Sequence, residues 1–272
     1  MIIYFRQSNL KAIILAAGEG KRLRPLTSNK PKCMIELFGK SIIQWQIDVF
    51  KHFGIHDISI VTGYHNKMIN LPNISYFQNK KYSTTNMIET LFCAKTKLND
   101  NVIISYGDII FEKRVLSKLI ASNEPISVVI DKDWKKYWTM RFKNPLEDAE
   151  SLLLDENDFI TDIGQSVKNY DKIEGQYIGL MKFQNNGIDL LKNFYEKCKN
   201  QSKLGVNPIN SKLVFEKSYM TDLLRGMITS GNKIKSVPIH NGWLELDSVN
   251  DFQLYQKKFK ENTINNFFSI NT

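Results

Sequence analysis

Residues 15–34 read LAAGEGKRLRPLTSNKPKCM, and this stretch shapes the interpretation of the whole chain. An apolar run precedes it, two glycines open it, and its cationic side chains are Lys21, Arg22, Arg24, Lys30 and Lys32. Like charges repel, so a loop this basic implies a strongly anionic ligand. Gly18 and Gly20 allow the backbone to approach a ligand closely and to turn its N–H groups toward phosphate. The stretch therefore predicts a phosphate-binding loop.

Composition indicates a folded chain with a substantial core. The 272 residues are 42% hydrophobic and 11% aromatic, enough for one large α/β domain spanning residues 1–272. Residues 1–10 show no signal-peptide pattern and are expected to form an N-terminal extension. No apolar run reaches the roughly 18 residues of a membrane span, so we expect no membrane insertion. Three distant cysteines favour a reducing, cytoplasmic setting over a disulfide scaffold or a zinc site.

The positive charge is local. The chain carries a net charge of +9, and residues 1–40 alone contribute +6. Nucleic-acid binding would explain a basic patch, but only six of the 37 cationic residues are arginine, the residue best suited to forked recognition of phosphates and bases. We therefore expect a small anionic ligand and no nucleic-acid partner.

Strand and helix patterns alternate along the first half of the chain. Apolar runs such as KAIILAAG, DISIVTG, NVIISYGD and ISVVID are separated by segments with apolar residues at helical spacing. This alternation predicts an α/β fold, a Rossmann-like mixed and mostly parallel sheet flanked by helices. The rhythm breaks after residue 131, which favours an inserted lid over residues 131–183. Ligands in such sheets bind beyond the carboxyl ends of the strands, where the glycine loop lies.

The full string A-A-G-x-G-x-R-L-x-P-L-T, followed by P-K, covers residues 16–32. It resembles the signature of the sugar-phosphate nucleotidyltransferase family, which joins a nucleoside triphosphate to a phosphorylated small molecule and releases pyrophosphate. The resemblance implies the nucleotidyltransferase fold. It also implies that Lys32 and Arg22 act in catalysis on the nucleotide phosphates. The nucleotide would bind the residues Ala16, Ala17, Gly18, Glu19, Gly20, Thr85, Asn86 and Tyr106.

Two aspartates follow strand patterns, Asp108 after IISYG and Asp247 after WLEL. Both positions resemble the metal-binding aspartates of the family, which implies Mg²⁺ held by hard oxygen ligands. A helix cap is the alternative role for a strand-terminal aspartate, above all for Asp247, which precedes Ser248 and a helical pattern. A phosphate nucleophile is already anionic, so the reaction needs no histidine base but needs cations that suppress repulsion.

Within the family, the chain looks most like bacterial phosphocholine cytidylyltransferases and their phosphonate relatives, which implies CTP as substrate. The lid fits an aminated acceptor, because aromatic faces attract ammonium groups, carboxylates pair with amines and an arginine fork grips an anion. Packing of the lid against the sheet is the alternative role for the tryptophans. The expected acceptor site comprises Trp134, Trp138, Arg141, Asp148, Glu150, Glu174 and Tyr177.

Several alternatives stay open at this stage. The acceptor is 2-aminoethylphosphonate, phosphocholine or phosphoglutamine, each of which would supply a precursor for surface glycans, capsules or lipids. A sugar-1-phosphate nucleotidyltransferase is the main alternative enzyme. A non-catalytic relative would be expected to lack Lys32, Asp108 or Asp247, yet all three are present. A homodimer is compatible with these patterns.

Overall fold

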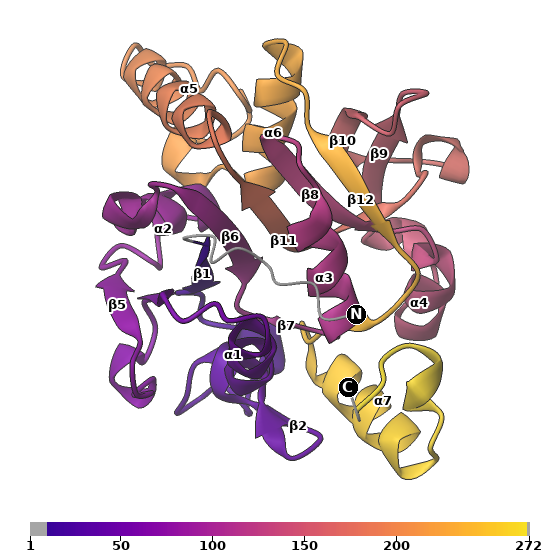
Figure 1. The fold of residues 1–272 in the computed structure, drawn as a ribbon. Coiled ribbons are helices and arrows are strands. Elements are labelled where there is room, and N and C mark those ends of the chain that lie inside the picture. The colour runs from indigo at the N-terminus through magenta and orange to yellow at the C-terminus, as the bar shows by residue number, and fades with distance from the viewer. Residues whose placement is uncertain (1–9, 271–272) are drawn as a thin grey trace.

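A computed structural model describes residues 10–270, and most of the N-terminal extension expected at residues 1–10 lies outside them. A seven-stranded sheet runs through the molecule (Figure 1). In spatial order its strands are β12 (Lys235–Ile239), β8 (Ile126–Asp131), β11 (Gln176–Phe183), β6 (Asn101–Tyr106), β1 (Leu10–Ala16), β4 (Ile58–Thr62) and β5 (Ser75–Gln78).

Most neighbours in this sheet are parallel. β1 pairs in parallel with β4 and β6, β4 with β5, and β12 with β8. Only β11 runs the other way, between β6 and β8. The predicted mixed, mostly parallel α/β sheet is therefore confirmed, and the start of β11 lies at the same edge as the carboxyl ends of its neighbours.

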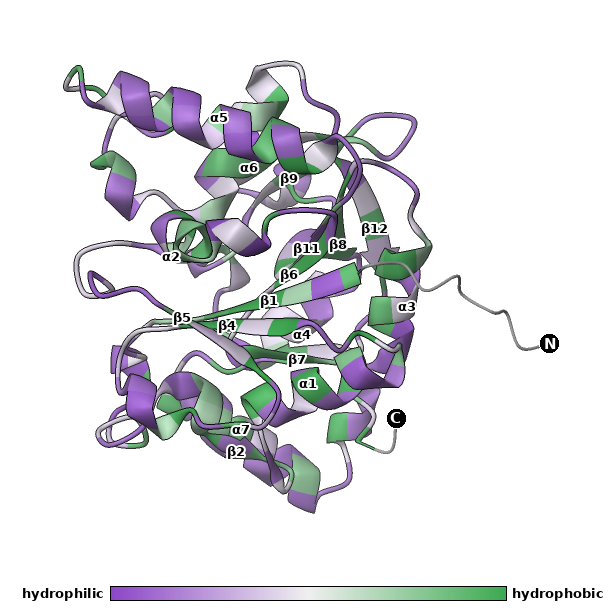
Figure 2. Cartoon of the chain, turned by 60° about the vertical axis from the view of Figure 1, so that its left-hand side comes forward, coloured by the Kyte–Doolittle hydropathy of each residue, from purple (hydrophilic) through white to green (hydrophobic). Residues whose placement is uncertain are grey.

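Alternation along the strands divides the core into two layers. In β1, Ala12 and Ile14 pack on one side, while Ile13 and Leu15 pack on the other. The first layer contains buried residues of α1 (Ile42–His52), α3 (Lys113–Ala121), α4 (Trp134–Arg141) and α7 (Val249–Lys260). The second contains those of α2 (Met87–Cys93), α5 (Gly187–Ser202) and α6 (Met220–Thr229). Figure 2 shows the strands between α2, α5 and α6 on one side and α1 and α7 on the other.

Local sequence explains where the helices begin and end. Ser41 caps α1 by accepting a hydrogen bond from the Gln44 backbone, and Gly54, with φ of 73°, ends the segment. Ser248 and Asp251 form a reciprocal capping box at the start of α7. Among residues 10–270, no helix is long and apolar enough to cross a membrane.

The inserted segment differs in extent from the lid expected at residues 131–183. Between β8 and β11 the chain forms α4 and a hairpin of β9 (Glu150–Leu154) and β10 (Ile160–Ser166). Residues 176–183, however, form β11 in the middle of the large sheet. A strand pattern alone does not show which sheet a strand joins, so the segment expected as a lid includes one strand of the large sheet.

Candidate functional site

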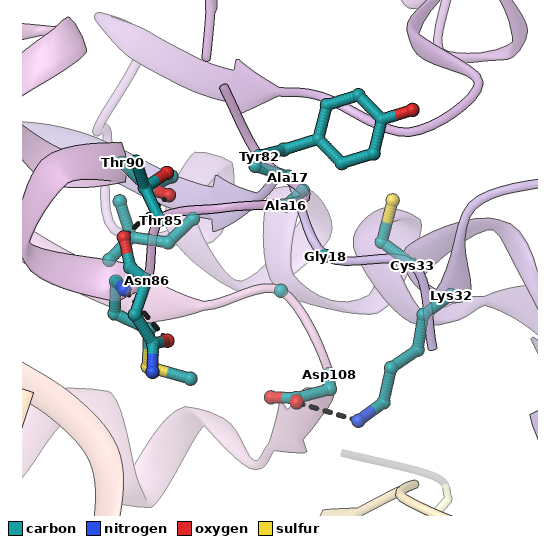
Figure 3. A pocket seen from close by; sticks show the side chains of 13 residues that line it. Ala16, Ala17, Gly18, Lys32, Cys33, Tyr82, Thr85, Asn86, Thr90 and Asp108 are labelled. Carbon is teal, nitrogen blue, oxygen red and sulfur yellow. Dashed lines mark hydrogen bonds and ion pairs between the residues drawn. The ribbon is translucent and has the colours of Figure 1, made fainter. Parts of the chain in front are cut away.

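A first pocket opens beyond the ends of β1 and β6. It is lined by the backbone of residues 15–18 and by Lys32, Cys33, Tyr82, Thr85, Asn86, Met87, Thr90, Gly107 and Asp108. Figure 3 shows the Tyr82 ring on one side of this pocket and Lys32 reaching toward Asp108 on another. Seven of the residues predicted from sequence line it: Ala16, Ala17, Gly18, Lys32, Thr85, Asn86 and Asp108.

The two loop glycines have different roles. A Cβ at Gly18 would meet no atom within 4 Å, so this position leaves the pocket open. Gly20 has φ of 60°, and a Cβ there would lie 3.1 Å from the side chains of both Lys32 and Thr27. Thr27 Oγ1 also donates to the Gly20 carbonyl at 2.8 Å. Gly20 therefore shapes the loop, while Gly18 faces the ligand space.

Glu19 does not line the first pocket. Its carboxylate lies 3.4 Å from Lys21 Nζ and 3.7 Å from Arg24 Nη2, and it balances charge within the loop itself. Residues 15–18 line the pocket instead, and a contribution of Glu19 to nucleotide binding stays a prediction.

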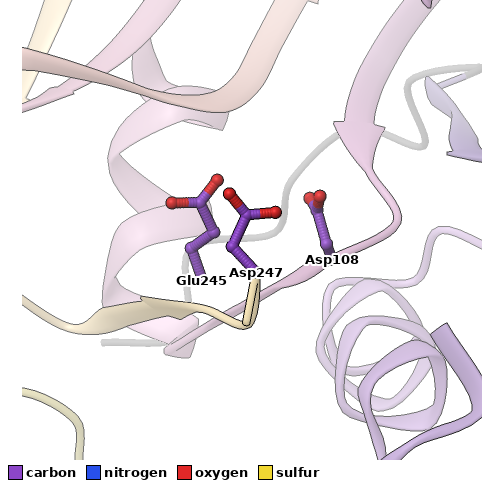
Figure 4. A group of neighbouring side chains, drawn as sticks. All are labelled: Asp108, Glu245 and Asp247. Carbon is purple, nitrogen blue, oxygen red and sulfur yellow. The ribbon is translucent and has the colours of Figure 1, made fainter. Parts of the chain in front are cut away.

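A short antiparallel ladder brings distant acids together. β7 (Ile109–Phe111) pairs with β13 (Trp243–Glu245), and Ile109 lies opposite Glu245. Just beyond the ladder, the Leu246 backbone donates to the Asp108 carbonyl at 3.0 Å. Asp108, Glu245 and Asp247 consequently each place a carboxylate oxygen within 4.8 Å of the others (Figure 4). Clustered carboxylate oxygens are the donors that Mg²⁺ prefers.

Two cations of the basic loop contact this acidic cluster. Lys32 Nζ lies 2.8 Å from Asp108 Oδ2 and 2.5 Å from Asp247 Oδ1. Arg22 Nη2 lies 2.5 Å from the other oxygen of Asp247. The capping alternative for Asp247 is not what the structure shows, because Ser248 caps α7 instead.

Burial and neighbouring charges shift the pKa values of these groups in opposite directions. Burial alone would lower the pKa of Lys32, but Asp108 and Asp247 outweigh it and raise that pKa above its ordinary value. Burial would raise the pKa of Asp247, but the charge and hydrogen bond of Lys32, helped by Arg22, lower it. Lys32 is thus held as a cation and Asp247 as an anion.

The third carboxylate is less well compensated. Burial raises the pKa of Glu245 to about 7; Arg141 opposes the rise, and Asp247 and Asp108 add to it. In addition, Asp108 Oδ1 is buried and accepts no hydrogen bond within the described part of the chain. An orphaned buried oxygen beside an under-compensated carboxylate fits a site that takes another cation.

A second pocket adjoins the first and is lined by acids and aromatic rings. Its walls are formed by Arg22, Met87, Tyr106, Trp138, Asp148, Glu150, Gln176, Tyr177, Ile178, Gly179, Tyr219, Thr221, Trp243 and Glu245. Met87 borders both pockets. Six of the residues predicted from sequence meet here, although Arg22 and Tyr106 were expected to contact the nucleotide: Arg22, Tyr106, Trp138, Asp148, Glu150 and Tyr177.

Tyr106 lies in the second pocket because of its contact with β11. Its ring packs edge-on against Tyr177 at 5.6 Å between centroids. A Cβ at Gly179 would come within 2.5 Å of the Tyr106 ring, so only glycine allows the ring to lie there. This close approach accompanies the placement of Tyr106 in the second pocket, and its expected role in nucleotide binding stays a prediction.

Three residues predicted to bind the acceptor do not reach the second pocket. The Arg141 side chain has 0% exposed surface, and its guanidinium is bound to Glu245 and Asp251. Trp134 is buried against Trp138 and Tyr170. Glu174 is exposed and accepts a hydrogen bond from the Leu154 backbone.

Sequence reasoning missed Glu245, although a signal was present. Glu245 and Asp247 are two residues apart in an extended segment, so their side chains point to the same side. The contributions of Tyr82 and Gln176, by contrast, follow only from the way their segments fold over the two pockets.

Comparison with known proteins places this site in a family context. Residues 12–159 match the family model described as the MobA-like NTP transferase domain. A CTP:phosphoglutamine cytidylyltransferase from Campylobacter jejuni is 40% identical over 260 residues, covering 92% of this chain and 100% of that protein. A choline-phosphate cytidylyltransferase from Streptococcus pneumoniae is 35% identical over 42% of this chain and 51% of its own length.

Solved structures share the fold at lower identity. A CTP:phosphocholine cytidylyltransferase from Streptococcus pneumoniae superposes with a TM-score of 0.70 at 22% identity, covering 92% of this chain and 99% of that one. An inositol-1-phosphate CTP transferase from T. maritima gives a TM-score of 0.69 at 21% identity, covering 93% and 97%.

The acidic cluster predicts that Glu245→Gln weakens binding of a divalent cation. Replacing one of three carboxylates with a neutral amide removes a negative charge from the cluster and should lower Mn²⁺ affinity by tenfold or more, as measured by electron paramagnetic resonance of free Mn²⁺. Glu174→Gln removes an exposed carboxylate outside both pockets and should leave the affinity unchanged. Equal affinities in wild type and Glu245→Gln would remove Glu245 from the site.

Proposed function

The chain belongs to the MobA-like NTP transferase family, and we propose that it transfers CMP from CTP to a phosphorylated small acceptor of the phosphoglutamine type. The nucleotidyltransferase expected from residues 16–32 is confirmed at the level of enzyme class. The observation that carries the finer proposal is the second pocket, where carboxylates and aromatic rings face the acidic cluster.

The first pocket supports a nucleotide site. The open backbone at Gly18 offers space for phosphate oxygens, and Lys32 supplies a fixed cation at its edge. Asn86 caps α2, and its Nδ2 donates a hydrogen bond to the Lys217 carbonyl at 3.3 Å. These contacts fix the position of this wall of the pocket. We assign the base and ribose of CTP to the wall around Tyr82, Thr85 and Asn86.

The proposed reaction is an in-line displacement at phosphorus. An anionic oxygen of the acceptor phosphate attacks the α-phosphorus of CTP, a new P–O bond forms, and the bond to the β-phosphate oxygen breaks to release pyrophosphate. Lys32 and Arg22 would stabilise negative charge on the transferring and leaving groups. No proton has to be removed, and no histidine lines either pocket among the described residues.

The residues present fit a magnesium ion. Asp108, Glu245 and Asp247 would hold it, since they offer hard oxygen ligands and Asp108 Oδ1 has no other described partner. When bound, Mg²⁺ neutralises phosphate charge and helps orient the reacting groups. Lys32, which contacts two of these carboxylates here, would turn from them toward the phosphates.

The second pocket supports an aminated acceptor. Asp148 accepts a hydrogen bond from Trp138 Nε1 at 3.1 Å, which fixes both an aromatic wall and a carboxylate. Glu150 opens to the same pocket. A cationic amine would be stabilised by both carboxylates and by cation–π contact with the ring faces. A neutral sugar would leave this negative charge uncompensated.

A grid of substrates tests the proposal directly. Pyrophosphate release is measured with Mg²⁺ while CTP, UTP, dTTP, ATP and GTP are crossed with phosphoglutamine, phosphocholine, 2-aminoethylphosphonate and glucose-1-phosphate. The proposal predicts release with CTP and phosphoglutamine above every other pair. Preferred use of glucose-1-phosphate would contradict the aminated-acceptor assignment, and preferred use of another nucleotide would contradict the CTP assignment.

Lys32→Ala should reduce kcat by about a hundredfold, the scale expected for loss of one transition-state charge contact. Lys21→Ala is the matched control, because Lys21 lies on the same loop, is exposed and lines neither pocket. Its kcat should stay within about twofold of wild type, as for a surface ion pair. A loss of less than about tenfold for Lys32→Ala would exclude a catalytic role.

The pKa of Glu150 predicts that acceptor binding depends on pH. Glu150 keeps exposed surface at the mouth of the pocket, but desolvation by the surrounding atoms, with the charges of Asp148 and Asp222, raises its pKa to about 7. Its carboxylate forms as pH rises through that value, so affinity for an ammonium-bearing acceptor should increase with pH and be lost below it. The measurement is KM for phosphoglutamine against pH in wild type and Glu150→Gln.

Glu150→Gln should show a flatter profile, with KM for CTP unchanged. Titration of the acceptor phosphate contributes equally to both proteins and cancels in their ratio. Superimposable profiles would show that Glu150 does not contact the amine.

A further inference from the structure

Arg141 lines neither pocket, and each of the three nitrogens of its guanidinium donates a hydrogen bond to a carboxylate. Nη1 donates to Glu245 Oε2 at 2.7 Å, Nε donates to Asp251 Oδ1 at 2.9 Å, and Nη2 donates to Asp251 Oδ2 at 3.2 Å. The side chain has 0% exposed surface. A buried charge is costly unless every donor has a partner, so such a fork marks a position with a specific task.

Hydrogen bonds with Tyr137 and Tyr255 fix the backbone of Glu245. Its N–H donates to the Tyr137 hydroxyl at 2.8 Å, and its carbonyl accepts from the Tyr255 hydroxyl at 2.7 Å. The two hydroxyls are hydrogen-bonded to each other at 2.5 Å. Tyr137 and Arg141 lie one turn apart on α4, and Tyr255 lies on α7. Glu245 is therefore fixed at its N–H, its carbonyl and its carboxylate.

Asp251 links Arg141 to the turn that contains Asp247. Its Oδ2 accepts from the Asp247 N–H at 3.1 Å, the Ser248 N–H at 2.9 Å and Ser248 Oγ at 3.0 Å. The same oxygen accepts from Arg141. One guanidinium thus reaches Glu245 directly and Asp247 through Asp251.

We propose that Arg141 is a positioning residue that orients Glu245 and Asp247 for the divalent cation, rather than a residue that grips the acceptor. Three carboxylates gathered at one point repel one another and would turn apart without an internal cation behind them. Arg141 supplies that charge at Glu245 Oε2 and at Asp251, and it contacts neither carboxylate oxygen of Asp247. This inference rests on the metal assignment made under the proposed function.

The test measures Mn²⁺ binding to nucleotide-free protein by electron paramagnetic resonance, together with KM for Mg²⁺ and kcat at saturating substrates. Arg141→Met should lower Mn²⁺ affinity and raise KM for Mg²⁺ by about tenfold to a hundredfold, the range for outer-sphere partners of metal ligands. Arg141→Lys keeps the charge but not the fork, so it should restore part of the loss.

A double-mutant cycle separates positioning from general destabilisation. If Arg141 acts through Glu245, adding Arg141→Met to Glu245→Gln should lower Mn²⁺ affinity much less than it does in wild type. Where Arg141→Met proves too unstable to purify, Arg141→Lys carries the same cycle.

Lys182→Met is the matched control for loss of a buried cation. Lys182 is 2% exposed on β11, and its ammonium donates to the carbonyls of Ile120 and Ser122, away from the residues that line either pocket. The Lys182→Met protein should differ from wild type in thermal stability, while its Mn²⁺ affinity stays at the wild-type value.

Two results would overturn this inference alone: wild-type Mn²⁺ affinity in folded Arg141→Met, or equal losses in Arg141→Met and Lys182→Met. Failure of wild type itself to bind Mn²⁺, with no Mg²⁺ dependence of turnover, would instead overturn the metal assignment, and this inference with it.

Discussion

The contact between the Lys32 ammonium and the carboxylates of Asp108 and Asp247 is the interaction on which the rest of the site depends. It joins three parts of the chain that are distant in sequence: the basic loop, the end of β6 and the segment after β13. Each partner would be destabilising by itself, since a buried unpaired charge loses its hydration without compensation. Together they fix the relative positions of the segments that form the site.

This arrangement explains why so basic a loop is compatible with folding. Lys32 and Arg22 find carboxylates within the protein, and Glu19 lies between Lys21 and Arg24. Under the proposed function, a magnesium–nucleotide complex would bring the opposite pair of charges, a divalent cation for the carboxylates and phosphates for the lysine and arginine. Binding would therefore exchange partners without leaving a charge uncompensated, and the two halves of the ligand should bind together.

The fold class and the enzyme class could be predicted from sequence, because the alternation of strand and helix patterns and the spacing of residues 16–32 carry local information. Alternation places Glu245 on the same side as Asp247, but its proximity to Asp108 arises from the β7–β13 ladder, a long-range pairing that spacing along the chain does not show. Arg141 and Trp134 were misplaced for a related reason. Their polar and aromatic neighbourhood indicates a binding surface, but spacing along α4 does not show how deeply each side chain is buried.

The exchange of partners by Lys32, from carboxylates to phosphates, is the central claim for this site. A crystal structure with Mn²⁺ and a non-hydrolysable CTP analogue tests it most directly, because anomalous scattering locates the metal. We predict Mn²⁺ among the carboxylates of Asp108, Glu245 and Asp247, with the Lys32 ammonium moved to the phosphates. A bound nucleotide with Lys32 still joined to Asp108 and Asp247, and no metal between them, would contradict it.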